Sequence, residues 1–212
     1  MPNHITSQVR IGGSKKATAK LVKDSKLIQD GDVERNEFDF NAVIKMPPEL
    51  LITSGSNVDL GMAAYNQAHY DKEAKYSWWA ERYPNVTGPE TLKKHLEASD
   101  NDMDKQALVE GKQALDNLRK HGYKDWYDWS NAQWGTKWNA YDVHYIDGGD
   151  DFIAIQLDTA WDTPQGIWSA LRDKGFTVDG FYYGEMEGYE EIGEKAWDYF
   201  SAYQNVEVEY NG

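Results

Sequence analysis

A predicted β-hairpin in the second half of the chain constrains the fold more than any other stretch. Apolar residues occupy alternate positions in both of its strands, namely Tyr141, Val143 and Tyr145 in the first and Ile153, Ile155 and Leu157 in the second. A period of two is typical of a strand with one buried face. Residues 147–150, Asp-Gly-Gly-Asp, supply a turn between the strands. The chain therefore contains an antiparallel sheet, to which its other elements must be added.

Elements on both sides of the hairpin predict how this sheet is completed. Residues 4–11 form a strand, and Ser14 caps the helix that follows. Thr163 and Pro164 open a second helix, and residues 176–185 form another strand. The order is then strand, helix, strand, strand, helix, strand. This order predicts an α+β protein with a ferredoxin-like βαββαβ core.

The middle and the end of the chain extend this core. Residues 38–44 predict a short strand, and the polar, alanine-rich middle predicts three helices, over about 57–79, from Pro89, and over about 102–122. The tail predicts a helix over 190–203 and an edge strand over 206–210. The expected division is a ferredoxin-like core of residues 1–50 and 125–188, a helical insertion of residues 51–124, and an acidic C-terminal helix-strand extension of residues 189–212.

Charge and composition restrict the classes of function. The net charge of -14 disfavours direct binding to nucleic acid, because Lys and Arg must meet the phosphates. From position 179 onward the chain has nine Asp and Glu residues and only one Lys, which gives this segment a net charge of -8. The absence of cysteine excludes disulfides and thiol nucleophiles. Since no apolar run could span a membrane or act as a signal peptide, we expect a cytoplasmic location, in a bacterial host cell.

Four segments resemble one known family. They are MPNHITSQVRIGG at the start, FDFNAVIKMPPEL, WGTKWNA (134–140) and DTAWDTP (158–164). Together they are similar to the YubB-type ferredoxin-like proteins of bacteriophages and conjugative plasmids, over roughly residues 1–50 and 125–190. The resemblance implies a ferredoxin-like protein of a mobile genetic element whose activity is not assigned. The family usually has an aromatic residue where this chain has His4.

The WGTKWNA and DTAW motifs predict a binding cluster. One motif enters the first hairpin strand and the other leaves the second, and antiparallel pairing brings these ends together. The expected cluster has aromatic walls, a cation and a carboxylate, supplied by Trp134, Lys137, Trp138, Asp158 and Trp161. It forms either a ligand pocket or a structural clasp in which the Lys pairs with the Asp and the indoles cap the core.

Other chemistry has weaker support in the sequence. Asp158, His144 and Glu185 could serve acid–base catalysis, but no nucleophile or paired carboxylates accompany them in a recognisable pattern, so a catalytic site is not expected. Asp100, Asp102 and Asp104 imitate an EF-hand loop that then lacks its Gly and Glu. No phosphate-binding motif is present, and we expect neither metal nor cofactor.

The sequence favours a non-enzymatic phage or plasmid accessory protein that binds a host protein. Its expected partner surface is acidic and comprises Glu185, Glu187, Glu190, Glu191 and Glu194. Such a surface imitates nucleic acid and fits a basic nucleic-acid-binding protein, such as a component of a defence or nucleic-acid-processing system. The alternatives are a nucleic-acid or small-ligand binding module that uses the tryptophan cluster, and an acid–base enzyme. The oligomeric state stays open.

Overall fold

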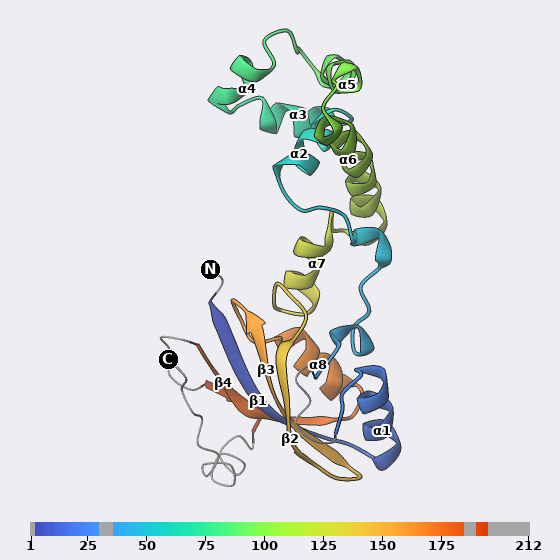
Figure 1. The fold of residues 1–212 in the computed structure, drawn as a ribbon, viewed down its shortest axis with the longest axis vertical. Helices are drawn as coiled ribbons and strands as arrows, with labels where there is room; N and C mark the ends of the chain where they lie inside the picture. The colour runs from blue at the N-terminus through green and yellow to red at the C-terminus, as the bar shows by residue number, and fades with distance from the viewer. Residues whose placement is uncertain (1–2, 30–35, 185–189, 195–212) are drawn as a thin grey trace. The chain divides into compact units, whose positions relative to one another are not determined.

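A computed structural model describes residues 3–29, 36–184 and 190–194 of the chain. It shows an α+β protein with a five-stranded antiparallel sheet (Figure 1). The chain divides into two compact units, one formed by residues 1–45 and 130–212 and the other by residues 46–129. The sheet belongs to the first unit. No helix in the described ranges is both long and apolar enough to cross a membrane.

The sheet has the strand order β2-β3-β1-β4-β5. Its strands are β1 (His4–Gly12), β2 (Tyr141–Gly148), β3 (Phe152–Ala160), β4 (Thr177–Gly184) and β5 (Glu190–Ile192). Every pairing is antiparallel, and β1 lies between β3 and β4. The predicted hairpin of β2 and β3 is confirmed, as are the strands before and after it.

Two helices of the sheet unit contribute to its hydrophobic core together with the strands. They are α1 (Lys15–Asp24) and α8 (Gln165–Asp173). Along β1, the apolar Ile5, Val9 and Ile11 and the polar Ser7 are buried, while the alternate residues are partly exposed. The helix α8 buries Ile167, Trp168 and Leu171, as its apolar stripe predicts. The cap of α1 is also confirmed, because the Ser14 hydroxyl accepts a hydrogen bond from the Ala17 amide.

Three local predictions for the sheet unit are wrong. The residues predicted as a strand over 38–44 contain instead a 3-10 helix, η1 (Phe40–Ala42), because the Asp39 carboxylate accepts the Asn41 amide and turns the chain. The helix α8 begins one residue later than predicted, and the Thr163 hydroxyl meets the Trp168 Nε1 at 3.1 Å rather than a backbone amide. Both errors come from side-chain contacts that periodicity does not encode.

The third error concerns β2, whose alternation is interrupted. Two irregularities in the β2–β3 register shift the faces, and Asp142 adopts a φ of 48° at the first of them. As a result, Tyr141 lies opposite Asp158 and Tyr145 lies opposite the buried Ile155, so the two tyrosines point to different faces. The prediction had placed them on one face.

The start of the C-terminal extension also differs from its prediction. The helix predicted over 190–203 is replaced at its beginning by strand β5, which pairs with β4 and buries Ile192. Pairing with the sheet edge outweighs the local helical pattern here. Residues 195–203 of that predicted helix and the strand predicted over 206–210 lie outside the described residues.

The helical unit contains η2 (Pro48–Leu50), α2 (Ser56–Ala63), α3 (Gln67–Glu73), α4 (Ser77–Arg82), α5 (Pro89–Ala98), α6 (Asp102–His121) and the start of α7 (Trp126–Gln133). The helix predicted over 57–79 is divided into three, since Asn66 caps a new helix start. The start at Pro89 and the helix over 102–122 are confirmed. The backbones of α2 and α6 approach closely where Gly61 and Gly111 meet. A Cβ atom added to Gly111 would lie only 2.2 Å from the Gly61 carbonyl carbon, so this contact requires glycine.

Candidate functional site

One end of the sheet collects the chain segments that carry both sequence motifs. Residue pairing places His4 beside Ala160, Ile5 beside Gly184, and Tyr141 beside Asp158. The starts of β1 and β2 therefore lie with the ends of β3 and β4. WGTKWNA precedes β2 and DTAW ends β3, so the predicted meeting of the motifs follows from the antiparallel register.

Trp134 faces the interior of the sheet unit. Its side chain is 4% exposed, and its Nε1 donates a hydrogen bond to the Ile44 carbonyl oxygen at 2.9 Å. Its ring meets the fully buried Phe40 ring edge-on, with 5.7 Å between the centroids. A buried indole with its N–H satisfied stabilises a core and offers no surface to a ligand. Trp134 therefore has a structural position.

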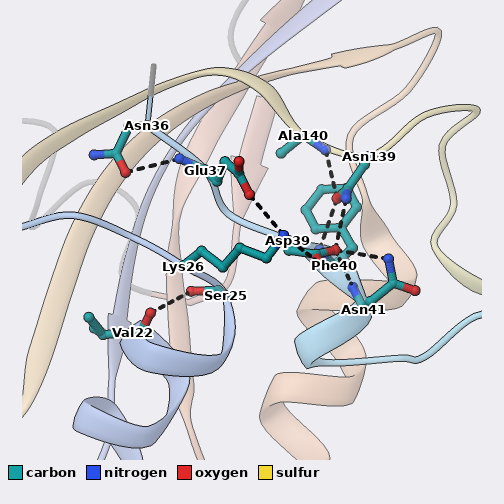
Figure 2. A network of polar contacts seen from close by, with 10 residues as sticks. All are labelled: Val22, Ser25, Lys26, Asn36, Glu37, Asp39, Phe40, Asn41, Asn139 and Ala140. Atoms are coloured by element: carbon teal, nitrogen blue, oxygen red, sulfur yellow. Dashed lines mark hydrogen bonds and ion pairs between the residues drawn. The ribbon is translucent and has the colours of Figure 1, made fainter. Parts of the chain in front are cut away.

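Asn139, at the other end of WGTKWNA, joins the motif to η1 (Figure 2). Its Oδ1 accepts hydrogen bonds from the Phe40 amide at 2.9 Å and the Ala140 amide at 3.0 Å. Its Nδ2 donates to Asp39 Oδ1 at 2.9 Å. We refer to Asp39, Phe40, Trp134 and Asn139 as the clasp. The clasp fixes segments almost 100 residues apart in the sequence.

The electrostatics of the clasp rest on Asp39. Burial alone would raise the pKa of its carboxyl group, but hydrogen bonds from the Asn41 side chain and amide and from Asn139, together with the charge of Lys26, hold that pKa below its usual range. Lys26 Nζ lies 3.6 Å from Asp39 and 3.1 Å from Glu37 (Figure 2). The carboxylate is therefore stabilised in its charged form.

Lys137, Trp138 and Trp161 face outward from the same motifs. The Lys137 ammonium group lies 4.7 Å from the ring centroid of Trp138 and 4.6 Å from that of Trp161. The two indoles are 38% and 47% exposed. Cation–π attraction holds the ammonium beside both rings. This arrangement differs from the predicted clasp, in which Lys137 pairs with Asp158.

Trp161 holds an unfavourable backbone conformation at an exposed position. Its φ is 78°, in the left-handed region, where a side chain costs on the order of 1–2 kcal/mol and glycine is preferred. Its amide donates a hydrogen bond to the Asn3 carbonyl oxygen at 2.9 Å. Its indole is nearly half exposed, so a strained backbone here holds an aromatic ring at the surface. Strained residues of this kind recur at binding and catalytic sites.

Tyr141 and His4 extend the outward group. The Trp138 and Tyr141 rings lie 6.3 Å apart, and the His4 ring meets Tyr141 edge-on at 5.7 Å. The Tyr141 hydroxyl donates to the Thr159 carbonyl oxygen at 3.0 Å, so at 2.8 Å it accepts a hydrogen bond from His4 Nδ1. We refer to His4, Lys137, Trp138, Tyr141 and Trp161 as the end patch. The sequence did not single out Tyr141 for it, because the irregular β2 register hides the face of that residue.

Asp158 lies beside the end patch on the partly exposed face of the sheet. Its Oδ1 accepts a hydrogen bond from the Thr6 hydroxyl at 2.8 Å. Burial raises the pKa of its carboxyl group, which the Thr6 bond lowers only in part, and the charge of Asp142 raises it further. The carboxylate is therefore less stable in its charged form than an ordinary aspartate.

The remaining predicted residues lie elsewhere or are not described. Glu190, Glu191 and Glu194 are exposed, on or just after β5. Glu185 and Glu187 lie outside the described residues. His144 Nε2 lies 3.3 Å from Asp142 Oδ1, and both side chains are more than half exposed, so this pair offers no enclosed site for acid–base chemistry. In the described part of the chain, no group of three or more His, Asp or Glu residues could hold a metal ion.

Comparisons of the chain with protein-family models, with curated proteins and with solved structures found no match.

Proposed function

We propose that this chain is a non-enzymatic binding module whose end patch contacts a partner protein. The observation that carries the proposal is the pair of exposed indoles, Trp138 and Trp161, which both contact the Lys137 ammonium group. Tryptophan is enriched among the residues that dominate the energy of protein interfaces. An indole that is already fixed before binding loses little conformational entropy when a partner covers it.

The backbone at Trp161 supports the same conclusion. A folding requirement at a φ of 78° would be met best by glycine. The chain instead has its most exposed tryptophan among the described residues at this position. Strain that persists in a well-supported segment is a recurrent property of binding and catalytic sites. The proposal explains why an indole occupies a position that does not favour it.

The charge of the chain supports a basic partner. Glu190, Glu191 and Glu194 are exposed, and Glu190 and Glu191 pair with Tyr182 and Phe181 of β4 in the same sheet. We propose a host protein with a basic nucleic-acid-binding surface as the partner, as in a defence or nucleic-acid-processing system. Complementary charge would accelerate association with the partner, and burial of the indoles would supply most of the binding energy.

We also propose that the chain belongs to the YubB-type ferredoxin-like proteins of mobile genetic elements. Within the sheet, the order β2-β3-β1-β4 and the helices α1 and α8 support a ferredoxin-like core to which β5 is added. The resemblance of the four sequence segments supports the family. Under this proposal the protein is an accessory factor of a phage or plasmid that acts on a bacterial host.

Affinity capture from nuclease-treated bacterial lysate tests the proposed function. The double variant Trp138→Ala/Trp161→Gly should lose a basic host protein that the unchanged chain retains at low salt and releases at high salt. Trp78→Ala is the matched control, since Trp78 is also exposed, at 42%, but lies in the helical unit. Retention of the same partner by the double variant would contradict the proposal.

A second candidate is a nucleic-acid or small-ligand binder that uses the same patch. The contact of the Lys137 ammonium group with two indole rings favours it, because a base can stack on an exposed indole while its phosphate pairs with the ammonium group. The net charge of -14 opposes it. Oligonucleotide binding that weakens with salt and disappears in Lys137→Met would favour this candidate over a protein partner.

A further inference from the structure

A groove with a volume of about 210 Å³ lies in the sheet unit, between α1, the segment of η1 and the end of α8. Its apolar lining comes from three separate parts of the sequence and consists of Ala17, Leu21, Ala42, Val43, Leu171 and Phe176. No residue of the end patch lines it. The groove is therefore a second feature of the sheet unit that the proposed function does not use.

The walls of this groove are fixed before anything binds. Leu21, Val43 and Leu171 are buried, which anchors each wall in the core. The η1 wall is held by the clasp, through the bonds of Asn139 to the Phe40 amide and to Asp39 (Figure 2). The Asp39 amide also donates to the Ser25 carbonyl oxygen, at 3.0 Å, next to the end of α1. A preformed groove binds with a smaller ordering cost than one that must form on binding.

The rim of the groove is basic, unlike the chain as a whole. Lys20 and Lys174 line it together with Asp24. The helix α1 carries four Lys against one Asp, whereas the whole chain has a net charge of -14. A local excess of positive charge on an acidic protein attracts a segment of opposite sign. The charge of the rim therefore selects an acidic occupant.

The two rim lysines already have contacts, but each can still bind a carboxylate. Lys20 pairs with Asp24 on the same helix, and its side chain is 75% exposed. Lys174 is exposed and donates a hydrogen bond to the Val43 carbonyl oxygen. An exposed ion pair such as Lys20–Asp24 contributes little to stability, so a carboxylate from outside can take up the Lys20 ammonium group at small cost. The Lys174 ammonium group has three N–H donors, so it can bond a carboxylate while it keeps its bond to the Val43 carbonyl oxygen.

The size of the groove limits what fills its floor. Pockets for whole small-molecule ligands usually measure roughly 300–1,000 Å³, so this groove is too small for one. It does suit one large apolar side chain, which is how anchor residues of protein segments are held. We propose that the groove docks an acidic peptide segment of a partner protein, with one bulky apolar side chain on the floor and flanking carboxylates at Lys20 and Lys174.

Titration of the ¹⁵N-labelled full chain with model peptides, followed by amide chemical shifts, tests this proposal. The first probe is a five-residue peptide with a central tryptophan and two glutamates on each side. The second replaces its tryptophan by alanine, and the third replaces its glutamates by lysines. We expect saturable shifts around Ala17, Ala42 and Leu171 with the first probe, and binding at least about tenfold weaker with the other two.

Two variants locate the site. Lys20→Glu/Lys174→Glu should weaken binding of the first probe about tenfold, whereas Lys105→Glu/Lys112→Glu, which changes two exposed lysines of α6, should leave it unchanged. Equal binding of the tryptophan and alanine peptides, shifts that map elsewhere, or no binding at millimolar peptide would overturn the proposal. Binding of the fatty acid decanoate at the groove, without binding of the peptide, would also overturn the proposal.

Discussion

Trp134 and Trp138 lie four residues apart in one motif and have opposite environments. Trp134 is 4% exposed and donates its indole N–H to Ile44, whereas Trp138 is 38% exposed and stands beside the Lys137 ammonium group. The inner side of the motif belongs to the clasp and the outer side to the end patch. Under the proposed function, one short motif serves folding with its inner face and recognition with its outer face.

The two aspartates that accompany these faces differ in the same way. Asp39 in the clasp has a lowered pKa, since its hydrogen bonds outweigh the effect of burial. Asp158 beside the end patch has a raised pKa, because burial dominates and the Thr6 bond compensates only in part. The surroundings of Asp39 in the clasp therefore stabilise its carboxylate, whereas the surroundings of Asp158 beside the end patch destabilise the charged form. The two aspartates therefore lie in opposite electrostatic environments.

The largest expected effect comes from the inner tryptophan. Trp134→Ala should lower the free energy of unfolding by about 3–5 kcal/mol, because it leaves a cavity against Phe40 and removes the bond to the Ile44 carbonyl. Trp138→Ala should lower it by less than about 1 kcal/mol. Urea unfolding at pH 7 measures both values. Equal losses would show that the motif has no separate faces.

Asn139→Ala should have the next largest effect. It removes three hydrogen bonds of a partly buried amide and leaves the Phe40 amide without this acceptor, which costs about 1–3 kcal/mol. The matched control is Asn85→Ala, on an exposed loop position of the helical unit, which should change stability by less than about 0.5 kcal/mol. A thermal melt of each variant compares them. A loss at Asn85 as large as at Asn139 would remove the distinction.

Asp39→Asn and Asp158→Asn should act in opposite directions at pH 7. Since the folded pKa of Asp39 is lowered, its carboxylate contributes stability above the unfolded value of about 3.9, and this is lost as pH falls through the folded pKa. The folded pKa of Asp158 is raised, so stability falls as pH rises from the unfolded value through the folded one.

Asp39→Asn should therefore destabilise the protein at neutral pH, and Asp158→Asn should not. Urea unfolding at pH 7 and at a pH below both folded values measures the two effects, which should shrink in acid as both carboxyl groups become neutral. A loss of folding in Asp158→Asn would favour the structural role that the sequence left open for Lys137 and Asp158 over a binding role.

The smallest effect concerns the backbone of Trp161. Trp161→Gly should be more stable than Trp161→Ala by about 1 kcal/mol, because glycine adopts a φ of 78° without the strain that a Cβ atom brings. The comparison of the two truncations isolates the backbone, since both remove the indole. Differential scanning calorimetry resolves a difference of this size. An alanine variant as stable as the glycine variant would show that the position carries no strain.

Sequence periodicity predicted the regular parts of this fold. Strands β1 to β4, the helices α1, α6 and α8, and the meeting of the two motifs follow from alternation, caps and antiparallel pairing. Strand β5, η1 and the irregular register at Asp142 do not, because each depends on contacts with distant residues. The sequence predicted that the tryptophans of the two motifs meet. It could not predict that Trp134 is buried and Trp138 exposed, since a loop has no periodic pattern of apolar residues.

The most direct test of the central claim measures folding and binding on one variant. Trp138→Ala/Trp161→Gly should keep the free energy of unfolding within about 1 kcal/mol of the unchanged chain and lose the partner captured from host lysate. That result would show that the outer indoles serve recognition. Loss of the fold, or an intact fold that still retains the partner, would contradict it.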